Sequence, residues 1–175
     1  MSNEVLNSGK SQSSTIDKFQ INSNKSGEVD LTGGITELRY YESILEPSVR
    51  VTVQYTDTGS SYEDKTVLEG LPIVGTEKCN IKMKDNAENE IEVDMYVDKV
   101  NPLSETAKNT VVMLGLVSKE HIQNQLVRVN KRFDGKLSDH INEILTNSTY
   151  IGTEKDVDIE ETQNNYNFIG NNKKP

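Results

Sequence analysis

Apolar and polar residues alternate strictly over residues 49–56, directly after a Glu-Pro-Ser turn. The apolar side of this run consists of Val49, Val51, Val53 and Tyr55. Because successive side chains of a strand point to opposite faces, a period of two predicts a half-buried strand. An apolar-rich run over residues 35–44 precedes the turn. We therefore expect an antiparallel strand pair with Pro47 in the connection, since proline cannot donate to a strand ladder.

Two further alternating runs lie on either side of a polar loop. Apolar side chains occupy every second position in residues 79–83 and again in residues 91–97, and the loop Asp85–Asn89 separates them. This arrangement predicts a β-hairpin. A loop over residues 101–109 then leads to residues 110–117, whose sequence TVVMLGLV predicts a strand buried on both faces.

The N-terminal part of the chain adds shorter elements. Residues 1–14 are rich in Ser and Asn and predict a flexible arm. Residues 16–21 alternate as a short strand, and Gly33-Gly34 marks a turn before the strand that begins at Ile35. Residues 57–70 predict a polar surface loop with a brief strand or turn at Thr66–Leu68. The whole is a meander of about six strands, enough for a small barrel or sandwich.

After Val117 the hydrophobic period changes from two to that of a helix. Ser118 is suited to cap a short helix over residues 119–125. Asp134-Gly135 predicts a turn. A second helix of about three turns is expected to bury the stripe formed by Leu137, Ile141, Ile144 and Leu145.

These periods divide the chain into a flexible N-terminal arm (1–14), a β domain (15–118) and a helical segment (119–175). Beyond Thr149 the sequence is polar and loop-like, with no further core-completing element. We therefore interpret residues 119–175 as the beginning of an α+β domain that is truncated. The expected fold class is mainly β with C-terminal α.

Composition narrows the possible functions. Hydrophobic residues make up 33% of the 175 residues, so the core is modest and partner subunits are expected to contribute stability. A net charge of −9 argues against sequence-specific nucleic-acid binding, which needs clustered Lys and Arg. No apolar run approaches a membrane span, so we expect no membrane insertion. The single cysteine excludes an intrachain disulfide.

Candidate catalytic and metal-binding residues are few. Cys79 lies in the apolar phase of its strand and is expected in the core, His121 lies in the short helix, and His140 is expected on a solvated flank of the second helix. No G-x-S-x-G motif, Walker loop or G-x-G-x-x-G motif is present. The acids of residues 156–161 lack the glycine of a calcium loop and predict a solvated strand or loop. We predict no catalytic residue, no metal site and no cofactor.

The remaining signal is an acidic row. Glu90, Glu92 and Asp94 fall on the polar side of one predicted strand. Such a row is ordinarily the wet side of a sheet. Alternatively, it lines a channel formed when several copies close into a ring.

Several segments together resemble a known family. They are the strand pair LRYYESILEPSVRVTVQYTDTG, the later strands IEVDMYVDKV and TVVMLGLVSKEHIQNQ, and the helix entry RVNKRFDGKLSDHINEIL. In this order they resemble the N-terminal region of the baseplate central-spike hub protein of T4-like contractile-tailed bacteriophages. The resemblance runs from about Thr15 to Leu145. The hub proteins of that family are considerably longer.

The resemblance implies a structural role without enzymatic activity. Residues 15–118 would be a tail-tube-like β-barrel or sandwich domain. In that family the hub is a trimer in which two tube-like domains per chain make a pseudo-sixfold ring. The ring joins the tail tube protein to the central spike/lysozyme protein and lets DNA pass. The resemblance thus implies a location in the virion tail baseplate, after assembly in the host bacterial cytoplasm.

Two other function classes remain open. A β-barrel module that binds a small ligand or glycan would need an aromatic-lined concavity, yet the chain has 6% aromatic residues and no tryptophan. A wall-degrading tail hydrolase would need a carboxylate pair or a metal constellation, and only scattered acids are present. On the ring hypothesis, Glu90, Glu92 or Asp94 are expected to face the axis.

Overall fold

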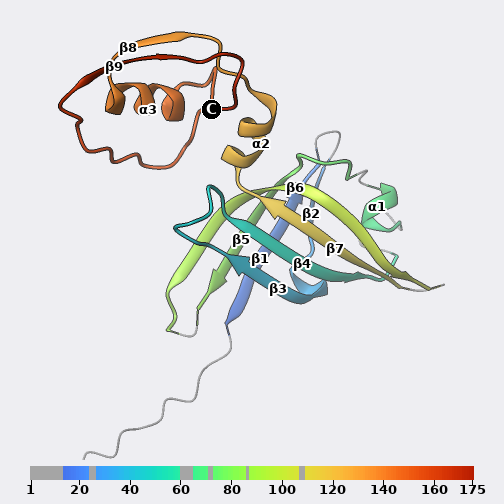
Figure 1. The fold of residues 1–175 in the computed structure, drawn as a ribbon. Helices are drawn as coiled ribbons and strands as arrows, with labels where there is room; N and C mark the ends of the chain where they lie inside the picture. The colour runs from blue at the N-terminus through green and yellow to red at the C-terminus, as the bar shows by residue number, and fades with distance from the viewer. Residues whose placement is uncertain (1–13, 24–26, 60–64, 71–72, 86, 107–108) are drawn as a thin grey trace, which may run out of the picture.

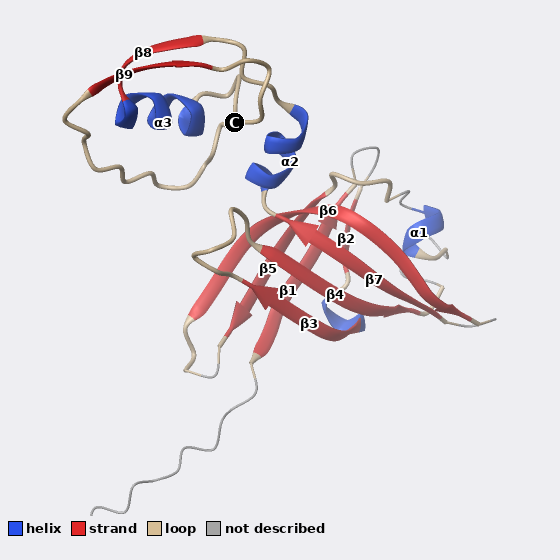
Figure 2. Cartoon of the chain, in the orientation of Figure 1, coloured by secondary structure: helices blue, strands red, loops and turns tan. Residues whose placement is uncertain are grey.

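The computed structural model describes residues 14–23, 27–59, 65–70, 73–85, 87–106 and 109–175, so most of the predicted N-terminal arm lies outside the described residues. The chain folds as a curved β sheet followed by a smaller unit of two helices and two strands (Figures 1 and 2). The predicted mainly β class is confirmed. No helix in the described part of the chain is both long and apolar enough to span a membrane.

Seven strands form the large sheet, in the order β2-β1-β5-β6-β7-β4-β3, and all neighbours are antiparallel. Their bounds are β1 Thr15–Asn22, β2 Glu28–Asp30, β3 Ile35–Tyr41, β4 Arg50–Asp57, β5 Lys78–Lys84, β6 Glu90–Glu105 and β7 Thr110–Val117. The predicted pair around Pro47 is confirmed as β3 and β4, with Pro47 in their connection. The hairpin around Asp85–Asn89 is confirmed as β5 and β6.

Strand β6 divides this sheet into two halves. It pairs with β5 through residues 90–96 and with β7 through residues 96–105, so Tyr96 has a partner on each side. Register shifts at 97/99 and 102/104 mark bulges, which bend a strand. We call β2-β1-β5-β6(90–96) the first half and β6(96–105)-β7-β4-β3 the second half. Figure 1 shows the strands of the two halves crossing.

The hydrophobic core fills the space between the two halves. Phe19 and Ile81 come from the first half, Tyr55 and Leu114 come from the second, and all four are fully buried. Val51, Val53 and Tyr55 of β4 are buried as predicted, because the alternation places them on one face. Val49 lies before the strand and is half-buried, and the same face also buries Asp57. One short helix, α1 (Val67–Gly70), adds the fully buried Val67.

Three predictions about the β domain were wrong in detail. The loop expected at residues 101–109 is mostly strand, because β6 continues to Glu105 and its bulges interrupt the alternation that would have revealed it. Thr66–Leu68 is not a strand or turn: a helix begins at Val67, and the Thr66 hydroxyl accepts the amide of Glu69 at 3.2 Å. Strand β7 is buried on one face and mostly half-buried on the other. The predicted turn at Gly33-Gly34 is present as a short 3₁₀ helix, η1 (Thr32–Gly34).

The C-terminal unit contains α2 (Lys119–Leu126), β8 (Arg132–Lys136), α3 (Leu137–Thr146) and β9 (Asn165–Ile169). Both helices were predicted, although Ser118 makes no side-chain cap to α2. The turn expected at Asp134-Gly135 was wrong, because those residues lie within β8 and pair with β9. Strand β9 was not predicted. All its residues are exposed, so its sequence shows no alternation between buried and solvated positions.

Helix α3 presents a different face to the core than its apolar stripe predicts. Leu137 and Ile141 are exposed, whereas Ser138 and His140 are buried. The His140 ring packs against Phe133 of β8, with 5.4 Å between ring centroids. The predicted solvated position of His140 was therefore wrong, since the aromatic side chain of β8 covers it.

Candidate functional site

The structure brings the three acids of the predicted row together on one face of β6. Glu90, Glu92 and Asp94 are exposed, while the intervening residues point toward the core side. The alternation of the strand fixes this arrangement. The row therefore exists as predicted, on the polar face of the first half of the sheet. Its orientation toward a ring axis stays a prediction.

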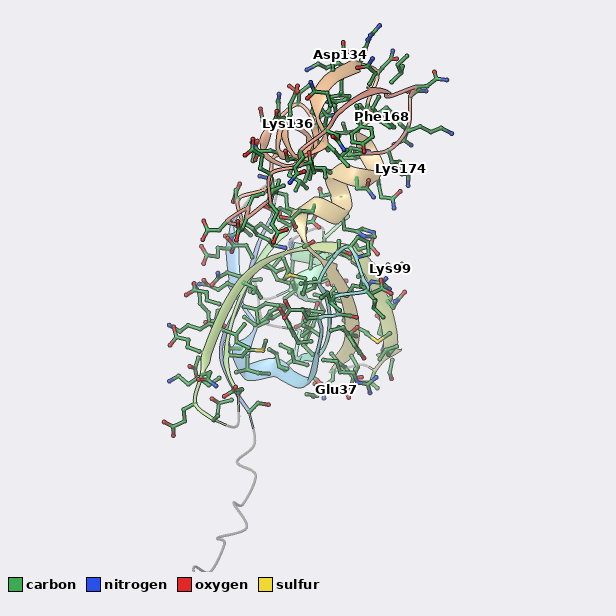
Figure 3. The ribbon with its side chains drawn as sticks, turned by 60° about the vertical axis from the view of Figure 1, so that its left-hand side comes forward. Glu37, Lys99, Asp134, Lys136, Phe168 and Lys174 are labelled. Carbon is green, nitrogen blue, oxygen red and sulfur yellow. The ribbon has the colours of Figure 1, made fainter. Side chains whose placement is uncertain are left out.

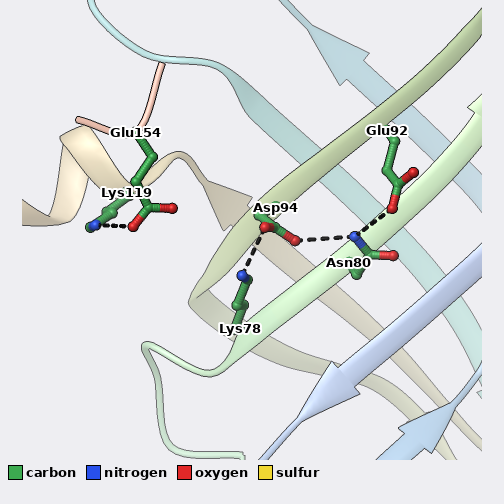
Figure 4. Close-up of polar contacts among 6 residues, drawn as sticks. All are labelled: Lys78, Asn80, Glu92, Asp94, Lys119 and Glu154. Atoms are coloured by element: carbon green, nitrogen blue, oxygen red, sulfur yellow. Dashed lines mark hydrogen bonds and ion pairs between the residues drawn. The ribbon is translucent and has the colours of Figure 1, made fainter. Parts of the chain in front are cut away.

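A second row, of basic and amide side chains on β5, pairs with these acids (Figure 4). Lys82 Nζ lies 2.7 Å from Glu90, and Lys78 Nζ lies 2.7 Å from Asp94. Between them, Asn80 Nδ2 donates to both Glu92 (3.3 Å) and Asp94 (3.1 Å). Cross-strand pairs of opposite charge stabilise a sheet modestly. The three acids thus face three lysines of β5, since Lys84 also lies opposite Glu90, and the ladder carries little net charge.

The carboxylate of Asp94 is the most strongly bonded member of this ladder. Partial burial raises its pKa, but the bonds from Lys78 and Asn80 outweigh burial and hold the pKa below its ordinary value. A lowered pKa in the folded state stabilises the fold above the unfolded-state value of about 3.9. That contribution is lost as the pH falls through the folded-state pKa.

Asp94→Asn is therefore expected to lower the free energy of unfolding by about 0.5 kcal/mol at pH 7, the usual size for an exposed ion pair. The difference from the unsubstituted chain should shrink as the pH falls through the folded-state pKa of Asp94 and vanish well below it, where both states bind the proton. Urea unfolding over a series of pH values from 7 downward measures this loss, with Asp98→Asn on the same strand as the control. A difference that does not change with pH would contradict the role of the charge.

A polar network joins α2 to the loop at residues 153–155. Lys119 pairs with Glu154 at 2.5 Å (Figure 4), and Glu120 accepts from the Thr153 hydroxyl at 2.7 Å and faces Lys155 at 3.2 Å. Burial raises the pKa of Glu120, but its bonds, that from Thr153 foremost, hold it below the ordinary value. A hollow of about 520 Å³ lies between this network and residues 92–96 of β6. These contacts hold α2 to the later loop of the same C-terminal unit, beside the first half of the sheet.

The candidate catalytic residues are not brought together. Cys79 is fully buried in the core, as predicted, and burial raises its pKa well above that of a reactive thiol. His121 Nδ1 lies 3.2 Å from the Ser48 hydroxyl, whereas His140 lies inside the C-terminal unit. The acids of residues 156–161 lie in an exposed loop, consistent with the prediction. Within the described residues no group of three or more His, Cys, Asp or Glu side chains could hold a metal. The absence of enzymatic activity stays a prediction.

The sequence did not reveal which strand edges lack a strand neighbour among the described residues. Besides the outer side of β2, these are the outer side of β3 and the β5 side of β6 over residues 98–105, where β6 pairs only with β7. Figure 3 shows Glu37 of β3 and Lys99 of β6 on the sheet, apart from Asp134 and Phe168 of the C-terminal unit. The apparent loop at residues 101–109 concealed the second edge. Both edges carry backbone amides and carbonyls that another strand could pair with.

Exposed apolar side chains gather at these two edges. The exposed large hydrophobic residues of the described β domain are Tyr41 (50%), Ile44 (100%), Leu45 (90%), Val74 (72%) and Leu103 (50%). The first three lie on β3 or in the connection that follows it, and the last two lie on β6 or just before β5. Exposed apolar groups that cluster at free strand edges mark a surface suited to another protein chain.

Comparisons with known proteins give a likeness among solved structures. No protein-family model matches the chain, and no curated protein matches it either. Among solved structures it is similar to the E. coli c3393 protein, described as a component of the type VI secretion system with structural similarity to the T4 bacteriophage tail proteins gp27 and gp5. The two are 9% identical with a TM-score of 0.44, over 95% of this chain and 38% of that one.

Proposed function

We propose that the chain is a structural subunit of a bacteriophage tail baseplate hub. Three copies would form a ring that joins the tail tube to the cell-puncturing spike and lets DNA pass. The observation that supports this best is the second half of the sheet, which has four antiparallel strands and, within the described part of the chain, a free edge on each side. The sequence resemblance from Thr15 to Leu145 also supports this choice of family.

The directions of the two edge strands favour continuation of the second half of the sheet from one copy into the next. An even number of antiparallel strands makes the two edge strands, β3 and β6, run in opposite directions. When β3 of one copy lies beside β6 of the next, the pairing is therefore antiparallel, like every other pair in the sheet. The lengths also match, since β3 has seven residues and the free edge of β6 spans residues 98–105. Head-to-tail contacts of this kind close into a ring when the rotation per copy allows it.

The charge of the ring would keep DNA from binding to it. Three copies at −9 each carry −27, which repels phosphate over a screened range of about 10 Å at 0.1 M salt. The lysines of β5 largely neutralise the acidic row, so this repulsion would come from the whole chain. We retain the placement of Glu90, Glu92 and Asp94 toward the axis as part of the proposal.

Mass measurement followed by imaging of the particles tests the proposal. We expect a closed ring of about 59 kDa, three times the 19.6 kDa of the chain, without detectable affinity for duplex DNA at physiological salt. A chain that stays monomeric at high concentration would contradict the proposal. A ring whose density places the acidic row on the outer wall would contradict only the proposed orientation of Glu90, Glu92 and Asp94 toward the axis.

The alternative of a β-barrel that holds a small ligand or glycan has less support. The space between the two halves is filled by fully buried side chains, among them Phe19, Tyr55 and Leu114. We therefore place no ligand inside the sheet. The proposed role also includes no enzymatic activity, and an assay of cell-wall hydrolysis with the purified chain tests that part directly.

A further inference from the structure

We propose that the connection between β3 and β4 docks on the segment before β5 of a neighbouring copy. Ile44 and Leu45 of one copy would contact Val74 of the next. The inference rests on the proposed ring and names the surface that holds its copies together. The other copy is the occupant because the two surfaces lie at opposite edges of one sheet half.

The β3–β4 connection holds two apolar side chains in water by an ordered turn. The Glu46 amide donates to the Ser43 carbonyl at 3.1 Å, and the Leu45 amide donates to the Ser43 hydroxyl at 3.2 Å. An ion pair of 2.7 Å between Glu46 and Arg50 fixes the turn to the start of β4. Ile44 is nevertheless 100% exposed and Leu45 90% exposed. Two adjacent apolar side chains that stay exposed contribute little to the folding of a lone subunit, whereas their burial against a partner would be favourable.

The receiving segment is held just as firmly. The fully buried carboxylate of Glu77 accepts the amides of Val74 (2.9 Å) and Gly75 (2.8 Å). The Val97 amide donates to the Glu77 carbonyl at 3.0 Å, and the Thr76 amide donates to the Val97 carbonyl at 2.7 Å. Residues 73–77 therefore lie directly beside the beginning of the free edge of β6. They leave the Val74 side chain 72% exposed there.

Antiparallel pairing between copies brings these two segments together. When β3 lies along the free edge of a neighbouring β6, its end at Tyr41 meets the beginning of that edge near Asp98. The turn after β3 then extends past the edge, to where the neighbour presents Val74. The start of β3 lies toward Leu103 in the same arrangement. All five exposed large hydrophobic residues of the described β domain would fall within one contact.

Mixed cysteine variants test the contact. Leu45→Cys and Val74→Cys chains are purified separately, mixed in equal amounts and oxidised, and disulfides are identified by mass spectrometry. The native Cys79 is fully buried and does not compete. We expect a disulfide between the two variants at about ten times the yield of a control mixture or more, since contact raises the effective concentration of the thiols. The control pairs Leu45→Cys with Leu126→Cys, the last residue of α2, which is 71% exposed and belongs to the C-terminal unit.

A second variant keeps the test independent of disulfide geometry. Ile44→Ser combined with Leu45→Ser alters only exposed side chains, so thermal unfolding should match the unsubstituted chain. The concentration needed for assembly should rise about tenfold or more, because the lost apolar contact weakens each interface. An unchanged assembly concentration would overturn the docking.

The results separate the docking from the ring. Rings that form with no disulfide above the control would overturn the docking and leave the proposed ring intact. The expected disulfide in open chains of copies would support the docking and contradict ring closure. A chain that stays monomeric without the disulfide would overturn both.

Discussion

Replacing Glu77 by alanine is expected to destabilise the β domain by about 3 kcal/mol. The Glu77 side chain is fully buried, and its two carboxylate oxygens accept the backbone amides of Val74 and Gly75. A buried amide left without a partner costs about 1–3 kcal/mol, and alanine leaves two. The gain from no longer burying a charge offsets part of this cost. Urea unfolding at pH 7 measures the difference.

Glu77→Gln is the matched control. Glutamine keeps one oxygen as an acceptor but places an amide group against the second backbone amide. We therefore expect its free energy of unfolding to lie between that of the unsubstituted chain and that of Glu77→Ala. Because Glu77 also positions Val74, the alanine variant should assemble less well than its stability alone would predict. A loss below about 0.5 kcal/mol for alanine, the usual effect of a surface substitution, would contradict the structural role of Glu77.

Replacing Phe133 by alanine is expected to unfold the C-terminal unit while the β domain stays folded. Phe133 is 2% exposed, and its ring lies 5.4 Å from that of His140, 6.4 Å from that of Tyr150 and 6.3 Å from that of Phe168. Truncation of a buried phenylalanine costs about 3–5 kcal/mol. So small a unit has few other buried side chains to compensate for that loss. Hydrogen exchange by mass spectrometry should show residues 127–175 unprotected and residues 15–117 unchanged.

Phe168→Ala provides the comparison for this variant. Phe168 lies opposite Phe133 in the β8–β9 pair but is 51% exposed, so a loss of about 1 kcal/mol and a folded unit are expected. The experiment also tests the domain division at residue 118. If Phe133→Ala unfolds both parts together, the chain is one cooperative unit and that division is wrong.

The strands with strict alternation could be predicted from the sequence, and the interrupted ones could not. Strands β4 and β5 each bury one face, so their apolar period matches their contacts. Strand β6 loses the period where its bulges begin, and its second part was therefore assigned to a loop. Strands β8 and β9 pair across 28 or more residues of chain with little buried surface to mark them. Pairing of that kind depends on tertiary structure, which local pattern does not encode.

The candidate site was predictable in its members but not in its charge. Alternation alone put Glu90, Glu92 and Asp94 on the polar face. Their neutralisation depends on register, which places Lys82 opposite Glu92 and Lys84 opposite Glu90. The five-residue loop between the strands contained that information, because loop length constrains hairpin register. The free edges could not be predicted, because they depend on which strands lie side by side, and no single segment of the sequence reveals that.

If the proposed ring forms, the division of β6 between two sheet halves has a consequence for the width of its channel. Each copy would offer four strands to a continuous wall, so three copies would close a barrel of twelve. Barrels of about eight strands are filled by their own side chains, whereas those of about 16–18 leave an aqueous channel. Twelve lies between these limits. If each chain carries a second tube-like domain, as the family resemblance implies, the wall would have twenty-four strands. The bore of the hub would then be set in steps of four strands, by the number of domains in the ring.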